Sequence, residues 1–156
     1  MITALQVVVL LTAAVLRGAD LGVSASGTAW FLGVAGLLAV GMYGVAETLA
    51  NRIPTLEEYT GALPALAIVP FFFAGSLFPI SALPAGLTVV SKILPLTHAL
   101  AVMRYGLLGG NASGLHDIWG MDDASAMAGL SLGVVALFAA ALTAVSIRTF
   151  RRAAVQ

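Results

Sequence analysis

The sequence predicts an all-α, polytopic membrane protein with about four transmembrane helices and a short re-entrant or interfacial helix pair before the last of them. Hydrophobic residues make up 60% of the 156-residue chain and charged residues only 9%, whereas a soluble domain has about a quarter of its residues charged. The mean hydropathy is +1.04. So little polar surface would not cover a globule in water, and we expect the chain to lie in a lipid bilayer.

The composition also excludes several classes of function. The formal net charge is zero, which offers no basic surface for nucleic acid. The chain has no cysteine, so it has neither disulfides nor thiolate chemistry. Its single lysine, Lys92, lacks the preceding glycines of a phosphate-binding loop. We find no nucleophile or metal motif, and we predict that the chain is not an enzyme and binds no cofactor itself.

Three full-length spans are predicted at 28–50, 61–78 and 125–147. A bilayer core of about 30 Å needs roughly 20 helical residues, and each segment meets or approaches that length. Pro64 and Pro70 lie inside the second of these spans. Neighbouring helices can satisfy the carbonyl groups that the two prolines leave free, so the segment remains a predicted span.

The first apolar segment, 2–16, is shorter than the others. Its fifteen residues reach about 22 Å as a helix. A secretory signal peptide is one interpretation, but no Lys or Arg precedes Arg17 to give it a basic start. A complete span in a thinned bilayer is a second. We favour a third, in which the chain begins partway along a span.

Arginines after the last span predict the orientation of the chain. Arg148, Arg151 and Arg152 directly follow residue 147. Because Lys and Arg close to the ends of spans are enriched on the cytoplasmic side, we place the C-terminus in the cytoplasm. The turn at 51–60 lies on the same side in this arrangement.

The segment 83–110 is apolar enough to suggest a further span, but it contains Lys92 and Arg104. Each such charge costs about 2.5–3.5 kcal/mol at the bilayer centre. Pro95 removes a backbone donor and disfavours a helical residue before it. We therefore predict a re-entrant or interfacial pair of short helices, at 85–93 and 96–108.

The flanks of this pair are also predicted. Pro79 and Pro84 should end the preceding span and turn the chain into the pair. Residues 109–123 are rich in glycine and polar side chains, which indicates a surface loop. The acidic residues and His116 of this loop match no metal-ligand spacing, and we interpret them as solvated.

Three acids are candidates for function. Glu47 lies well inside a predicted span and is a candidate proton carrier; alternatively it is an interfacial acid, or one paired with Arg52. Glu57 and Glu58 follow Pro54-Thr55, where acids stabilise a helix N-terminus. A contact surface for a cytoplasmic partner is the functional alternative for these two glutamates.

Small residues form stripes on two predicted helices, at a spacing that permits close packing in lipid. The stripes are Gly33, Gly36, Gly41 and Gly44 in one helix, and Ser125, Gly129 and Gly133 in the other.

An ordered series of motifs in 63–110 resembles the C-terminal half of type-2 ABC transporter permeases, the drug and polysaccharide exporter group. The series is Ala74-Gly75, Phe78-Pro79, Leu83-Pro84, Pro95-Leu96-Thr97, Arg104 and Gly109-Gly110. Members of that family usually have six spans. This chain, 1–156, is similar to the last four of them as a single transmembrane permease domain, with 2–16 as the span entered partway.

The resemblance implies the membrane subunit of an ATP-driven exporter in the bacterial plasma (inner) membrane, with a role such as drug resistance. Such a subunit pairs with a second permease copy or chain, and a separate ABC subunit binds and hydrolyses ATP. The solute expected is lipophilic or amphipathic. Residues Phe78, Pro79, Leu83, Pro84, Pro95 and Arg104 would form an extracytoplasmic re-entrant gate. Arg52, Glu57 and Glu58 would form the turn that faces the ATPase.

Two other functions remain open from the sequence. A small proton-coupled multidrug antiporter would use Glu47. A membrane assembly factor would transport nothing and would have no ATPase partner.

Overall fold

The structure is a computed structural model that describes residues 2–19, 21–22 and 24–153; residues 1, 20, 23 and 154–156 of the predicted domain 1–156 lie outside the described residues. All regular elements of the described chain are helical, which confirms the all-α class. They are α1 (Ile2–Leu16), α2 (Ala25–Ala50), α3 (Leu56–Phe73), the 3-10 helix η1 (Ile80–Ala82), α4 (Ala85–Ile93), α5 (Pro95–Leu107), α6 (Ser113–Trp119) and α7 (Ala124–Ala153).

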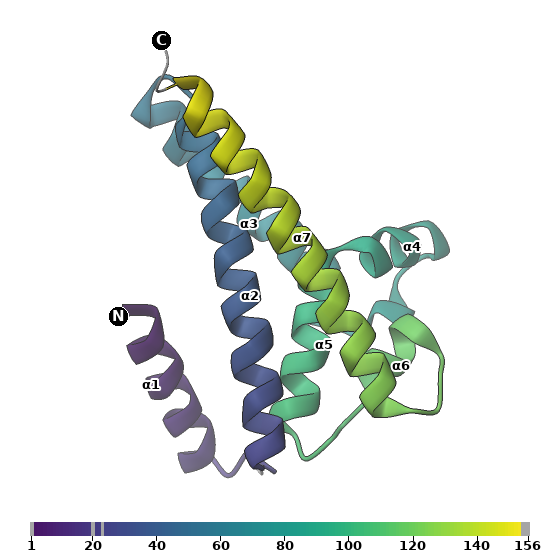
Figure 1. Cartoon of the computed structure of the whole chain (residues 1–156). Helices are drawn as coiled ribbons and strands as arrows, with labels where there is room; N and C mark the ends of the chain where they lie inside the picture. The colour runs from purple at the N-terminus through teal and green to yellow at the C-terminus, as the bar shows by residue number, and fades with distance from the viewer. Residues whose placement is uncertain (1, 20, 23, 154–156) are drawn as a thin grey trace.

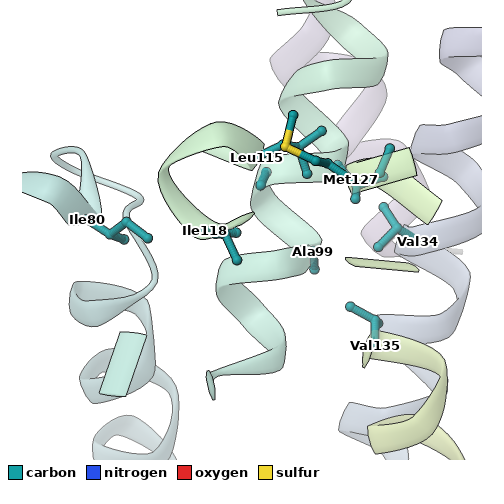
Figure 2. Packing of buried hydrophobic residues seen from close by; sticks show 10 residues of the cluster. Val34, Ile80, Ala99, Leu115, Ile118, Met127 and Val135 are labelled. Carbon is teal, nitrogen blue, oxygen red and sulfur yellow. The ribbon is translucent and has the colours of Figure 1, made fainter. Parts of the chain in front are cut away.

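The centre of the fold is formed by α2, α5 and α7, each of which packs against the other two. In Figure 1, α2 and α7 run side by side as long helices, and α5 lies against their lower halves. Buried side chains from these helices and from α6 form one apolar cluster (Figure 2), which includes Val34, Ala99, Leu115, Met127 and Val135. The core therefore joins α5 and α6 to the two long helices.

Two described helices, α2 and α7, are long and apolar enough to cross a membrane; the bent pair α4–α5 would add a third if it crossed as one unit. The helix α1 has only 15 residues. The first turn of α3 contains Glu57 and Glu58, which lower the hydropathy of this 18-residue helix. The assignment of α1 and α3 as spans, and with it the total of four, stays a prediction.

The helix α1 has the bounds predicted for the first segment, and it stands apart from the bundle in Figure 1. Its apolar side chains are largely exposed, as Leu10 at 69% and Leu16 at 82% illustrate. A helix that is apolar all round is stable when lipid or another chain surrounds it.

The predicted span 61–78 differs in both of its bounds from the observed helix α3. The helix α3 begins earlier because the Thr55 hydroxyl accepts a hydrogen bond from the Glu58 amide and caps the first turn. It also ends earlier, at Phe73, because Gly75 adopts a left-handed backbone conformation with φ 75°. Pro79 and Pro84 were predicted to end this span, and that prediction was wrong, because the turn begins at Gly75.

The predicted helix pair is confirmed almost residue for residue. The helices α4 and α5 meet at Leu94, and their axes are bent by 78°. Leu94 is extended, with φ −69° and ψ 126°, and Pro95 is the first residue of α5. This is the conformation that a residue before proline prefers.

The predicted surface loop 109–123 was wrong in part, because it contains α6. Leu115 and Ile118 lie three residues apart on one face of this helix, and both are buried in the central cluster. Gly120 ends the helix in a left-handed conformation. The glycine-rich composition of the segment concealed this short apolar face.

Candidate functional site

Four of the predicted gate residues lie between α3 and α4, namely Phe78, Pro79, Leu83 and Pro84, whereas Pro95 and Arg104 lie on α5. Arg104 is on α5, and its guanidinium reaches back to the end of α3. Its Nη2 atom donates to the carbonyl oxygen of Gly75 at 2.6 Å and lies 3.3 Å from that of Ser76. These carbonyls belong to the turn where α3 ends, so Arg104 fastens the start of the connecting segment to α5.

The prolines of the predicted gate start the short helices rather than end the span. Pro79 precedes η1, and Pro84 precedes α4. The Thr88 hydroxyl lies 3.0 Å from the carbonyl oxygen of Leu83 and 3.2 Å from that of Ile80. This hydroxyl therefore holds the turn between η1 and α4 in place.

The remaining gate residues have different environments. Leu83 is half-buried and packs against the central cluster. Phe78 is exposed, with 41% of its surface accessible. The structure therefore brings Leu83 to the packed core and fastens the turn at Gly75 to Arg104, while Phe78 is exposed. Whether these residues form a gate stays a prediction.

A buried chain of hydrogen bonds that includes residues of the α4–α5 helix pair was not predicted. The indole Nε1 of Trp119 donates to the Ser131 hydroxyl at 2.8 Å. That hydroxyl lies 3.1 Å from Nδ1 of His98, and the His98 Nε2 atom lies 2.9 Å from the Lys92 carbonyl oxygen. An indole only donates and a carbonyl only accepts. We therefore assign His98 its Nε2–H tautomer, with Ser131 donating to Nδ1.

This chain of hydrogen bonds joins four helices, because its members come from α4, α5, α6 and α7. His98 and Ser131 are buried, and the rings of His98 and Trp119 lie 5.6 Å apart. Satisfied buried polar groups fix one arrangement of the elements that carry them. The sequence showed a histidine in an apolar segment, but nothing in it indicated a partner that lies 33 residues away.

The buried hydroxyl of Thr97 is different. Its Oγ1 atom has no hydrogen-bond partner within the described chain, although the side chain is only 3% exposed.

The backbones of α2 and α5 meet at two glycines. A methyl group built on Gly27 would collide with the Gly106 carbonyl oxygen, and one built on Gly106 would collide with that of Gly27. Toward the C-terminal end of α2, a methyl group on Gly44 would lie 3.0 Å from the Leu142 backbone of α7. The predicted stripe of α2 is therefore a close-packing surface at Gly41 and Gly44, whereas Gly33 and Gly36 have open space beside them. The glycines of the other stripe, Gly129 and Gly133 on α7, also have open space beside them within the described chain.

The predicted ATPase-facing residues lie at the turn between α2 and α3. The side chains of Arg52, Glu57 and Glu58 are all exposed. Both glutamates are in the first turn of α3, where a carboxylate is favourable for the helix dipole. Their capping position is thus confirmed, and their contact with a partner stays a prediction.

Glu47 lies in the last turns of α2 and is half-buried. The Tyr43 hydroxyl donates to one carboxylate oxygen at 3.0 Å, and the Asn51 amide lies 3.4 Å from the other. Its partners in the described chain are these two neighbours rather than Arg52. The described chain shows no Glu47–Arg52 ion pair, and the roles of Glu47 as a proton carrier or an interfacial acid stay predictions.

Asp123 precedes α7 and caps it. Its Oδ1 atom accepts hydrogen bonds from the Ser125 hydroxyl at 2.7 Å and from the amides of Ser125 and Ala126. These donors stabilise the carboxylate, the Ser125 hydroxyl most strongly, and hold the pKa of Asp123 below its ordinary value. No three acidic or histidine side chains of the described residues gather as a metal site.

Comparison with known families decides the class of this chain. A family model described as ABC-2 type transporter matches residues 1–108, which run from α1 through α5 and include the helix pair. The chain belongs to the ABC-2 type transporter family. No curated protein and no solved structure matches it.

The family resemblance found in 63–110 is thereby confirmed. As an ABC-2 family member, the chain is a membrane component of a transporter, a class whose membrane part is not itself catalytic. The apolar helices α2 and α7 agree with a multi-pass membrane protein. The helices α6 and α7 lie outside the match but pack on the matched helix α5.

Proposed function

We propose that this ABC-2 chain is the permease subunit of an ATP-driven exporter, which forms the translocation pathway while a separate ABC subunit binds and hydrolyses ATP. The observation that carries the proposal is the family match over 1–108, which includes the whole connected segment from Gly75 to Arg104. The proposed site is the bacterial plasma membrane, with the C-terminus in the cytoplasm.

The proposed working parts are the two ends of α3. At one end the exposed residues Arg52, Glu57 and Glu58 present charge to an ATPase. At the other, the Arg104 contact transmits a movement of α3 to α5, since a guanidinium bonded to backbone carbonyls resists separation of the two helices. The re-entrant gate would open when this connection shifts.

The exposed apolar surfaces support a second permease subunit and the bilayer as neighbours. No residue of α3 is buried in the described chain, and Ile68, Val69 and Phe72 are each about half exposed. A helix of this kind is covered by lipid or by another subunit. We propose a lipophilic or amphipathic solute, because the described helices place few charges along such a pathway.

Transport by reconstituted protein tests the proposal. The chain would be purified with its ATP-binding subunit, placed in liposomes, and assayed for export of a rhodamine dye with ATP or with a non-hydrolysable analogue. We expect export only with hydrolysable ATP. Export driven by a proton gradient without ATP would contradict the proposal.

Glu47→Gln is the matched variant for the antiporter alternative. A proton-coupled antiporter would lose transport entirely, because its proton carrier would be gone. An ATP-driven exporter should retain most of its rate, since Glu47 is held by the neighbouring Tyr43 and Asn51. An assembly factor would show no solute flux in either form.

A further inference from the structure

A groove of about 310 Å³ lies between the elbow of the α4–α5 pair, α6 and α7. One wall is apolar and comes from three different helices. The residues of this wall are Ile93, Ile118, Val134 and Phe138. Trp119 and the buried His98 complete the lining. Lys92 is the only charged residue among the described lining residues.

The hydrogen-bond chain described above holds the walls of the groove in place. The Lys92 backbone is held by His98, and the Trp119 indole is held by Ser131. Both nitrogens of His98 are occupied by these contacts. The Lys92 ammonium is therefore the group in this lining that is free to bind a ligand.

An anion is a favourable partner for Lys92 in its position. Val134 and Phe138 lie about 15 and 21 Å along α7 from its first residue, at the helical rise of about 1.5 Å per residue. This part of α7 belongs to a helix apolar enough to cross the membrane. Lys92 is exposed there beside apolar side chains, and no carboxylate lines the groove. A lysine so placed extends toward the headgroup region, where an anionic group is a favourable partner for it.

We propose that the groove binds one anionic membrane phospholipid, with its phosphate on Lys92 and an acyl chain along Ile93, Val134 and Phe138. Charge complementarity selects the headgroup, and the mixed lining of one cation, one indole and aliphatic side chains matches an amphiphile. Trp119 is suited to the boundary between the headgroup and the chain, where indole rings are favourable. This binding does not depend on transport.

Quenching of Trp119 fluorescence by brominated lipids tests the proposal. The chain has two tryptophans, and Trp30→Phe leaves Trp119 as the sole tryptophan, which can be excited selectively at 295 nm or above, while it keeps an aromatic ring beside Tyr105. The protein would be reconstituted in phosphatidylcholine and titrated with brominated phosphatidylglycerol. Brominated phosphatidylcholine with the same chains is the reference. We expect saturable quenching by the anionic lipid at a lower mole fraction than by the zwitterionic one.

Variants of the single lysine make the test specific. Lys92→Gln should weaken the preference for phosphatidylglycerol about fivefold, the usual effect of one basic residue near an anionic lipid. Lys92→Arg should keep it, and so should Arg17→Gln, which removes an exposed charge elsewhere. Equal quenching by both lipids, or a Lys92→Gln titration like that of Arg17→Gln, would overturn the proposal. Displacement of the lipid by millimolar inorganic phosphate would assign the site to a free anion and would also overturn it.

Discussion

The guanidinium of Arg104 on α5 donates a hydrogen bond of 2.6 Å to the carbonyl oxygen of Gly75, the residue whose left-handed conformation ends α3. The charged guanidinium of Arg104 thus donates to a backbone carbonyl that lies 29 residues away in the sequence. A methyl group at Gly75 would lie 3.0 Å from the Ile80 side chain, so this turn has little room to rearrange. The contact connects the end of α3 to the helix pair.

Replacement of Arg104 by Gln should loosen this connection. Hydrogen bonds to charged groups contribute about 1.5–3 kcal/mol, and we expect a loss of stability of that size. Backbone amides of the connecting segment 74–84 should exchange with solvent faster, because that segment loses its attachment to α5. Hydrogen exchange with mass spectrometry measures this. Arg17→Gln is the control, and equal exchange in the two variants would contradict the role given to Arg104.

The close approach of α2 and α5 predicts that Gly106 does not tolerate a side chain. Gly106→Ala places a methyl group against the Gly27 carbonyl and should cost about 1–3 kcal/mol through overpacking. Gly33→Ala on the open face of α2 should be neutral or slightly stabilising, because alanine favours a helix. Thermal unfolding followed by circular dichroism compares them, and equal midpoints would refute the glycine contact.

Two buried hydroxyls should behave oppositely when they are removed. Ser131→Ala leaves the Trp119 donor and His98 Nδ1 without their partner, and each unsatisfied buried group costs about 1–3 kcal/mol. Thr97→Val removes a hydroxyl that has no partner within the described chain, and should leave stability unchanged or raise it. Thermal unfolding of both variants measures the difference. A Thr97→Val variant as unstable as Ser131→Ala would show that Thr97 has a partner outside the described residues.

Asp123 predicts a pH dependence at the start of α7. Its pKa is lowered in the folded chain by its hydrogen bonds, so the capping carboxylate stabilises the fold above the ordinary pKa of an aspartate. That stabilisation is lost as the pH falls below this value and through the lowered folded pKa. Unfolding midpoints of the native chain should therefore fall in acid. Asp123→Ser, which keeps a capping oxygen without the charge, should show a smaller fall; an equal fall would contradict the assignment.

Local patterns in the sequence predicted much of the fold. The bounds of α1 and the break at Pro95 follow from apolar length and proline, whereas α2 begins at Ala25, three residues before the predicted start, because Ser24 caps it. These signals act within a few residues, and the helix pair was placed correctly for this reason. The early end of α3 was missed because Gly75 was interpreted only as part of a family motif, whereas its backbone conformation ends the helix.

The candidate site was predicted less completely, because its contacts join residues far apart in the chain. Arg104 was identified, but its partner Gly75 depends on how α3 and α5 cross. Ser131 lies between Leu130 and Leu132 inside a predicted span, and nothing in that apolar pattern indicated a hydrogen-bond partner. Its bonds to His98 and Trp119 exist only because α6 folds as a helix against α7. No periodicity in one segment contains that information.

The most direct test of the central claim is native mass spectrometry of the complex, purified gently from its own membranes through a C-terminal tag. The account predicts that the chain is recovered together with a second permease subunit and an ABC ATP-binding subunit. ATP hydrolysis by the preparation should belong to the latter. Recovery of the chain with no ATP-binding subunit, together with transport that Glu47→Gln abolishes, would contradict the account.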